Sequence, residues 1–101
     1  MLIYNVTTKV EWSIYEDWLQ WMKEIHIPEI LNTGCFTGSN LLRLLDTDET
    51  EGPTYAAQYH AHSKADYNRY IELYSSVLRA SAHDKWGNKI ISFRSLMEVI
   101  N

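Results

Sequence analysis

Apolar and polar residues alternate along several stretches of the chain, and this period of two predicts β-strands. In the first stretch, Leu2–Val10, one face carries Leu2, Tyr4, Val6 and Val10, and the other carries Ile3, Asn5, Thr7 and Lys9. Three later stretches have a similar strand character, and Gly38 inside the second predicts a bulge or a close approach of backbone. Their ranges are Cys35–Leu45, Thr54–His62 and Lys89–Ile100.

A helical period begins after the first strand. Ser13 is the predicted N-cap, and Glu16, three residues later, completes a capping box. The apolar stripe that follows consists of Ile14, Trp18, Trp21 and Ile25, flanked by Tyr15, Leu19, Met22 and His26. Pro28 predicts a break or kink near His26–Ile27, because proline cannot donate an intrahelical hydrogen bond. A short turn over residues 29–32 and a stop at Thr33–Gly34 should follow.

A second helix is predicted between the third and fourth strands. Ser63 is its N-cap, with Asp66 at the capping-box position. The helix should run to Trp86–Gly87, and its core stripe is Tyr67, Ile71, Tyr74 and Leu78. The acidic segment 46–53, between the second and third strands, is predicted to be a solvated hairpin loop.

The resulting order, β-α-β-β-α-β, predicts an α+β fold of the ferredoxin-like type in one domain over residues 1–101. Two right-handed crossovers place both helices on one face of a four-stranded antiparallel sheet. We expect the open face to carry Ile3, Asn5, Thr7, Gln58, His60, Ser92 and Arg94. Because this mixed surface is poorly suited to bare water, we expect a homodimer formed through the sheet.

Charge and motifs narrow the function classes. Nine basic against thirteen acidic residues give a net charge of −4, which disfavours nucleic-acid binding. RNA-recognition domains share this element order, but Ala57 stands where their third strand needs a stacking ring. No phosphate-binding, dinucleotide-binding or C-x-x-C motif is present, so no cofactor is expected.

The chain also lacks the features of exported and membrane proteins. No secretory signal and no membrane span is predicted, because the first residues lack a basic region and no apolar run nears the roughly 18 residues required. The single cysteine, Cys35, is predicted to be a buried small hydrophobe. We therefore expect a cytoplasmic protein without a membrane partner.

The candidate site lies around the end of the first helix. His26 precedes the proline, and the helix dipole at such a position favours the charged imidazolium. Trp18, Trp21 and Met22 lie within two turns, which predicts an aromatic pocket for a small apolar or aromatic molecule, with His26 as an acid–base group. Asn5 and Arg94 are further candidate ligand-binding residues. In the alternative hypothesis, His26 and the tryptophans are structural parts of a non-catalytic interaction or ligand-sensing module.

Other histidines offer weaker chemistry. His60 and His62 share a strand face with metal-ligand spacing, but the sequence shows no third ligand and we predict no metal site. A haem-degrading protein of this fold would carry an Asn on the first strand and a His on the second helix. Asn5 and His83 match that requirement only loosely.

Several motifs together resemble one family of short bacterial proteins, the domain of unknown function 4286. They are I-Y-N-V (3–6), W-x-x-W-M (18–22), H-I-P (26–28), T-G-x-F (33–36) and F-R-S-L-M-E-V (93–99). The resemblance covers essentially the whole chain and implies a ferredoxin-like, dimeric α/β-barrel fold without an assigned activity. That architecture is similar to antibiotic-biosynthesis monooxygenases and mutarotases, whose pockets lie near the boundary between helices and sheet.

Overall fold

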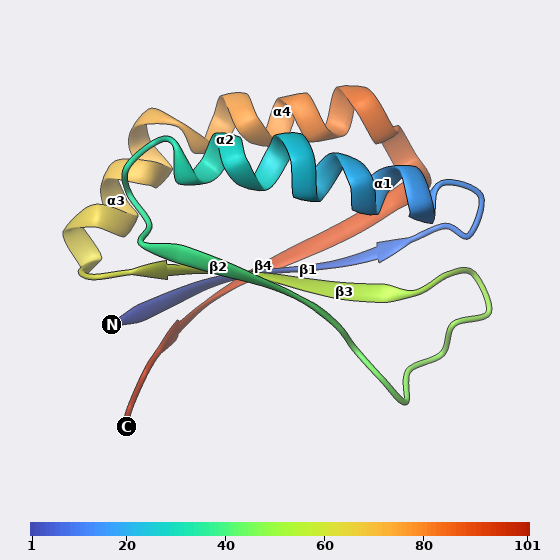
Figure 1. Ribbon diagram of the computed structural model, residues 1–101, viewed down its shortest axis with the longest axis horizontal. Coiled ribbons are helices and arrows are strands. Elements are labelled where there is room, and N and C mark those ends of the chain that lie inside the picture. The colour runs from blue at the N-terminus through green and yellow to red at the C-terminus, as the bar shows by residue number, and fades with distance from the viewer.

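A computed structural model describes all residues 1–101 and contains one four-stranded antiparallel sheet with its helices on one face (Figure 1). The strand order is β2-β3-β1-β4, so the α+β, ferredoxin-like prediction is confirmed. The strands are β1 (Leu2–Val10), β2 (Gly38–Arg43), β3 (Thr54–Ala61) and β4 (Ile90–Glu98). The helices are α1 (Tyr15–Trp21), α2 (Ile27–Leu31), α3 (Lys64–Leu73) and α4 (Ser75–Trp86). None of the helices combines the length and the hydropathy that a membrane-spanning segment requires.

The central strand β1 matches its predicted range and its predicted inner face. Tyr4 and Val10 are buried in the core, and Leu2 and Val6 pack against it. Strand β2 begins later than predicted, at Gly38, so this glycine opens the strand rather than bulging it. The preceding residues Cys35 and Phe36 are buried in the connection from α2, which confirms that the cysteine is a core residue.

The predicted orientation of β4 was wrong. Arg94 pairs across the sheet with Val6, and Ser92 pairs with Thr8. Directly opposed residues of antiparallel strands share a face, so Arg94 and Ser92 lie on the side of the helices rather than on the open face. A hydrogen bond of 2.8 Å between the Thr8 and Ser92 hydroxyls fixes this register. Ile91 and Phe93 occupy the open face instead.

The first helical region continues through the proline instead of breaking there. A π-helical turn, Met22–His26, joins α1 to α2, and the Ile27 amide donates to the Met22 carbonyl five residues back. Pro28 lies in the first turn of α2, where its missing donor costs little. The wide turn advances the helix face by one residue: Ile25, predicted to lie in the core stripe, is 49% exposed, whereas Ile27 is buried.

Of the two predicted helix caps, one is formed and the other is not. Ser63 caps α3 as predicted, with its hydroxyl accepting from the Asp66 amide at 3.2 Å. The predicted cap at Ser13 was wrong, because α1 begins after Ile14 and no side chain caps it.

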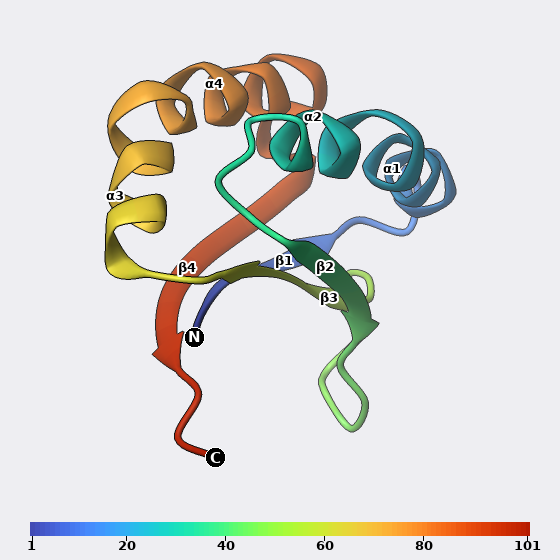
Figure 2. The same ribbon diagram turned by 60° about the vertical axis from the view of Figure 1, so that its left-hand side comes forward.

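The predicted second helix is in fact two helices. Tyr74 leaves the helical conformation with φ of −127°, and the axes of α3 and α4 diverge there (Figure 2). The Ser75 hydroxyl donates to the Ile71 carbonyl at 2.8 Å and holds the corner together. Tyr70, which the predicted stripe did not include, is the buried residue of α3.

The core between the helices and the sheet is strongly aromatic. The ring of Tyr4 lies at its centre, with ring centroids 5.6 to 6.1 Å from those of Phe36, Tyr59, Tyr67 and Tyr70. Aromatic pairs at such separations add about 0.5 to 1.5 kcal/mol beyond the burial of their area. Thirteen aromatic residues are thus accommodated largely within the one layer that joins the helices to the sheet.

The β2–β3 connection is the solvated hairpin loop that the sequence predicts, but it is anchored. Arg43 forms a two-pronged ion pair with Glu49, at 2.8 Å for the shortest contact. Two backbone hydrogen bonds hold the loop against the end of β1: Val10 donates to Pro53 at 2.9 Å and Trp12 donates to Glu51 at 3.2 Å. Gly52 lies between these bonds, buried against the backbone of Val10.

Candidate functional site

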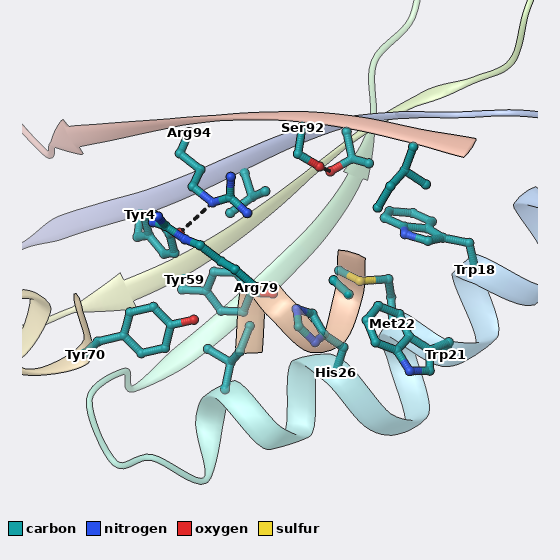
Figure 3. Close-up of a pocket in the computed structure, with 15 residues that line it drawn as sticks. Tyr4, Trp18, Trp21, Met22, His26, Tyr59, Tyr70, Arg79, Ser92 and Arg94 are labelled. Atoms are coloured by element: carbon teal, nitrogen blue, oxygen red, sulfur yellow. Dashed lines mark hydrogen bonds between the residues drawn. The ribbon is translucent and has the colours of Figure 1, made fainter. Parts of the chain in front are cut away.

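A cavity of about 50 Å³ lies between the helix layer and the sheet (Figure 3). Its walls come from β1, α1, the π-helical turn, α2, β3, α3, α4 and β4. The lining residues are Tyr4, Val6, Thr8, Trp18, Trp21, Met22, His26, Ile30, Tyr59, Tyr70, Arg79, Ala82, Ile90, Ser92 and Arg94. None of them is an aspartate or a glutamate. The cavity is therefore aromatic and apolar, with two guanidinium groups as its only permanent charges.

The structure brings most of the predicted site residues together. Trp18, Trp21, Met22 and His26 line the cavity from one helical segment, and Arg94 reaches it from β4. Asn5 does not line it, because this side chain lies on the open face of the sheet. There its amide donates to the Thr7 hydroxyl at 2.9 Å and to the Ser95 hydroxyl at 3.4 Å.

His26 is packed as a neutral group rather than as a charged helix end. Its ring stacks on Trp21, with a centroid distance of 4.5 Å and an interplanar angle of 18°. Burial, helped by the positive charge of Arg94, lowers the pKa of His26 from 6.5 to about 4. The expectation that the helix dipole favours imidazolium was wrong, because the helical region does not end at His26 and the half-buried ring lines the cavity. Its Nδ1 atom is buried without a hydrogen-bond partner.

Two arginines meet at one phenol oxygen beside the cavity. Arg79 Nη2, from α4, donates to the Tyr4 hydroxyl oxygen at 3.0 Å, and Arg94 Nε, from β4, donates to the same atom at 3.1 Å (Figure 3). Neither guanidinium has a carboxylate within ion-pair distance. Sequence reasoning missed Arg79 and Tyr4. One signal in the sequence could have indicated Arg79. It directly follows Leu78, a residue of the predicted core stripe, so a charged side chain lies next to the apolar side of the helix.

Two further phenols line the cavity and were also missed as site residues. Burial raises the pKa of Tyr59 and of Tyr70 above the ordinary value of 10.0, so both remain neutral hydroxyls at physiological pH. Tyr59 lies on the inner face of β3, and Tyr70 lies on the inward side of α3.

The cavity opens between α4 and β4 into a groove of about 280 Å³. The groove and the cavity share Arg79, Ala82, Ile90, Ser92 and Arg94, and His83 and Gly87 complete the groove. An engineered apolar cavity that binds benzene has roughly 150 Å³. The inner cavity alone is smaller, so an aromatic ligand would lie partly in the groove.

The other histidines form no comparable site. His60 shares a 3.2 Å hydrogen bond with the Asn40 amide, and His62 is exposed. No three His, Cys, Asp or Glu side chains lie close enough to hold a metal ion. Asn5 and His83, the pair considered for haem chemistry, lie on different sides of the sheet: Asn5 is on the open face, and His83 lines the groove on the helix side.

Solved structures similar to this chain share its fold at very low sequence identity. One is an ethyl tert-butyl ether D (EthD) family protein from Bacillus halodurans, with a TM-score of 0.71, 8% identity, and coverage of 99% of this chain and 100% of that one. Another is a dimeric ferredoxin-like protein from an uncultured marine organism, with a TM-score of 0.60, 12% identity, and coverage of 99% and 95%. A third, from Deinococcus radiodurans, is a protein proposed to be an antibiotic biosynthesis monooxygenase, with a TM-score of 0.59, 12% identity, and coverage of 100% and 94%. At these identities the likeness shows the fold alone.

A match to a family model extends over nearly the whole chain. No curated protein matches the chain. The model of one family, described as a domain of unknown function, DUF4286, matches residues 1–100. The resemblance carried by the motifs of β1, the first helical region and β4 is thereby confirmed: this chain belongs to the DUF4286 family.

Proposed function

We propose that this protein binds a small molecule in the cavity between its helices and its sheet, next to His26. The observation that carries the proposal is the buried Nδ1 atom of His26, which has no hydrogen-bond partner although it lies in a cavity wall. A buried polar atom left without a partner costs about 1 to 3 kcal/mol. A ligand or a bound water that supplies a partner would recover that cost, and the adjoining groove gives it a path to the atom.

The role of His26 follows from its neutrality. At pH 7 a ring with a pKa of about 4 is a hydrogen-bonding group and a weak base. The acid–base role predicted from the sequence stays a prediction, and it requires that the ligand raise this pKa. A negatively charged ligand group near the ring would do so, because an opposite charge stabilises the imidazolium.

Blocking the cavity mouth tests the proposal. Ala82 is half-buried and lines both the cavity and the groove, so the ring of Ala82→Phe would occupy the ligand path. We expect the uncharged probe phenylacetamide to shift the NMR signals of the Trp18 and Trp21 indole groups in the native protein. In Ala82→Phe its affinity should fall at least about tenfold, which corresponds to about 1.4 kcal/mol.

The matched control is Ala80→Phe, two residues away on the exposed side of α4. It adds the same ring to the same helix and should leave probe binding unchanged. Circular dichroism melting curves establish that both variants are folded. Equal probe shifts in the native protein and Ala82→Phe, or none in either, would contradict binding in this cavity.

We further propose that the open sheet face joins two copies of the chain. One row of residues crosses all four strands on this face, because Phe93 pairs with Thr7, Thr7 with Ala56, and Ala56 with Leu42. Phe93 and its neighbour Ile91 on the same face are 65% and 67% exposed. Exposed apolar residues that gather on one face mark an interaction surface, and a protein of similar fold is dimeric.

Sedimentation velocity tests this interface. We expect the native chain to sediment as a dimer and Phe93→Asp to sediment as a monomer, because the substitution places a charge in a face that the partner covers. Val77→Asp, which replaces a 70% exposed residue on the outer side of α4, should remain dimeric. A monomeric native chain, or a dimer that Phe93→Asp leaves intact, would contradict the proposed interface.

A further inference from the structure

The distribution of charge around the cavity is unusual for a protein with a net charge of −4. Arg43 and Arg69 form ion pairs with Glu49 and Asp66. Arg79 and Arg94 have no carboxylate partner, and both donate to one phenol oxygen, that of Tyr4. Neither the cavity nor the groove is lined by an acidic residue. The local charge is thus opposite in sign to that of the whole chain, which indicates a place for an anion.

The hydrogen bonds of Tyr4 strengthen this assignment. Its hydroxyl oxygen accepts from both guanidinium groups, and the hydroxyl donates to no group of the protein. The phenolic proton and the remaining guanidinium N–H groups are therefore available to one incoming oxyanion. Guanidinium is suited to this task, because its planar fork matches the two oxygens of a carboxylate and charge-assisted hydrogen bonds are about twice as strong as neutral ones.

The different depths of these groups indicate how a bound ligand would be oriented. Arg79 and Arg94 are exposed residues shared by the groove and the cavity, whereas Trp18, Trp21 and Met22 are buried farther in. An anionic head would remain at the mouth, where it keeps part of its hydration. An uncharged body would enter the aromatic cavity, where the groups that can form hydrogen bonds, among them His26 and the hydroxyls, carry no formal charge.

We infer that the cavity binds an organic carboxylate, with its carboxylate between Arg79, Arg94 and the Tyr4 hydroxyl, and with a small apolar or aromatic body directed toward Trp18, Trp21 and His26. This inference rests on the proposed function and adds the chemical class of the ligand. It also assigns roles to Arg79 and Tyr4 in addition to the predicted Arg94.

The test compares two probes of nearly the same shape, phenylacetate and phenylacetamide, by NMR titration of the native protein. We expect phenylacetate to bind at least tenfold more tightly than phenylacetamide. Its affinity should fall as sodium chloride is raised, whereas that of the amide should not change, because salt screens only the charged interaction. Arg79→Gln and Arg94→Gln should each reduce the preference for the acid several-fold and leave amide binding unchanged.

Arg69→Gln is the matched control, since Arg69 is exposed on α3 and contacts Asp66 and the Gly34 carbonyl. It should keep the full preference for phenylacetate. Glutamine at positions 79 and 94 retains a hydrogen-bond donor for Tyr4. Melting curves identify any variant that has lost its fold. Such a variant is replaced by the corresponding Arg→Lys substitution, which should lower the preference for phenylacetate over phenylacetamide by a smaller factor.

The outcomes separate the two proposals. Equal binding of acid and amide would overturn the carboxylate inference and leave the cavity proposal standing. Binding of neither probe would overturn both. Inorganic phosphate that binds as tightly as phenylacetate would overturn the claim that head and body are recognised together, because it would show a bare anion site at the mouth.

Discussion

Gly52→Ala should lower the free energy of unfolding by about 3 kcal/mol, because a methyl group at this position has no space. An added Cβ would overlap the carbonyl oxygen of Val10 and lie 2.8 Å from its carbonyl carbon. Both neighbours are backbone atoms, and the hydrogen bonds from Val10 to Pro53 and from Trp12 to Glu51 hold the two segments together. Relief of the overlap would require these bonds to lengthen. The expected loss corresponds to a fall in melting temperature of at least about 12 °C for a domain of this size.

Urea denaturation followed by tryptophan fluorescence would measure this effect. Gly38→Ala serves as the control, because a Cβ at Gly38 meets no atom within 4 Å. The control should change the stability by less than about 1 kcal/mol. If both variants were equally stable, the loop would have to be able to move away from β1, and its anchoring role would be refuted.

The second large effect is a loss of stability in mild acid caused by His26. The pKa of His26 is about 4 in the folded chain, whereas in the unfolded chain it takes its ordinary value of 6.5, so the unfolded chain binds more protons between these values. His26 therefore does not reduce the free energy of unfolding well above pH 6.5, and it reduces this free energy progressively as the pH falls toward 4. The expected loss from this residue is about 2 kcal/mol between about pH 8 and pH 5. It reaches about 3 kcal/mol below about pH 4.

Replacement of the imidazole isolates this contribution from the carboxylates that also titrate in acid. Urea denaturation of His26→Leu at about pH 8 and pH 5 should show about 2 kcal/mol less acid destabilisation than the native protein. No carboxylate lines the cavity, and burial keeps the phenols of Tyr59 and Tyr70 neutral, so Arg94 is the charged group that acts most directly on the ring. His62→Gln, at an exposed site, should retain the native pH dependence. An unchanged pH profile in His26→Leu would mean that the imidazole is solvated in the folded protein.

Local patterns were sufficient to predict the order and type of most elements. The alternation in Leu2–Val10 and in Thr54–Ala61 survives folding, because each of these central strands buries one apolar face against the helices. The Ser63 cap was also predictable, because the cap and the amide it bonds lie within four residues of each other. Interactions of this range depend little on the rest of the chain.

Errors arose where backbone geometry outside the simple periods decides which way a side chain points. Ile25 fits an ideal helical stripe, but the π-helical turn moves the inward positions to His26, which is half-buried and lines the cavity, and to Ile27, which is buried. The orientation of Ser92 and Arg94 depends on the register between β1 and β4, which lie at opposite ends of the chain. Alternation in a strand does not show which of its two sets of side chains faces the core. In β4 the apolar residues Ile91 and Phe93 lie on the open side, so apolarity alone predicts the wrong inner face.

The candidate site was predictable in part for the same reason. Trp18, Trp21, Met22 and His26 belong to one helical segment, so their proximity is visible in the sequence. Arg79, Tyr4 and Arg94 come from three elements and meet only through the tertiary fold. The cluster that carries the charge of the site therefore required the structure, whereas the aromatic wall did not.

The π-helical turn has a consequence for changes in chain length. It equals an α-helix with one inserted residue, and Lys23 and Glu24 within it are exposed. Deletion of either residue would convert the bond from the Ile27 amide to the Met22 carbonyl into an ordinary α-helical bond, and Trp18 and Ile30 could keep their places on either side. Only the residues between them would rotate, His26 among them. A relative of this protein shorter by one residue at this point would thus retain the fold while presenting a different group to the cavity.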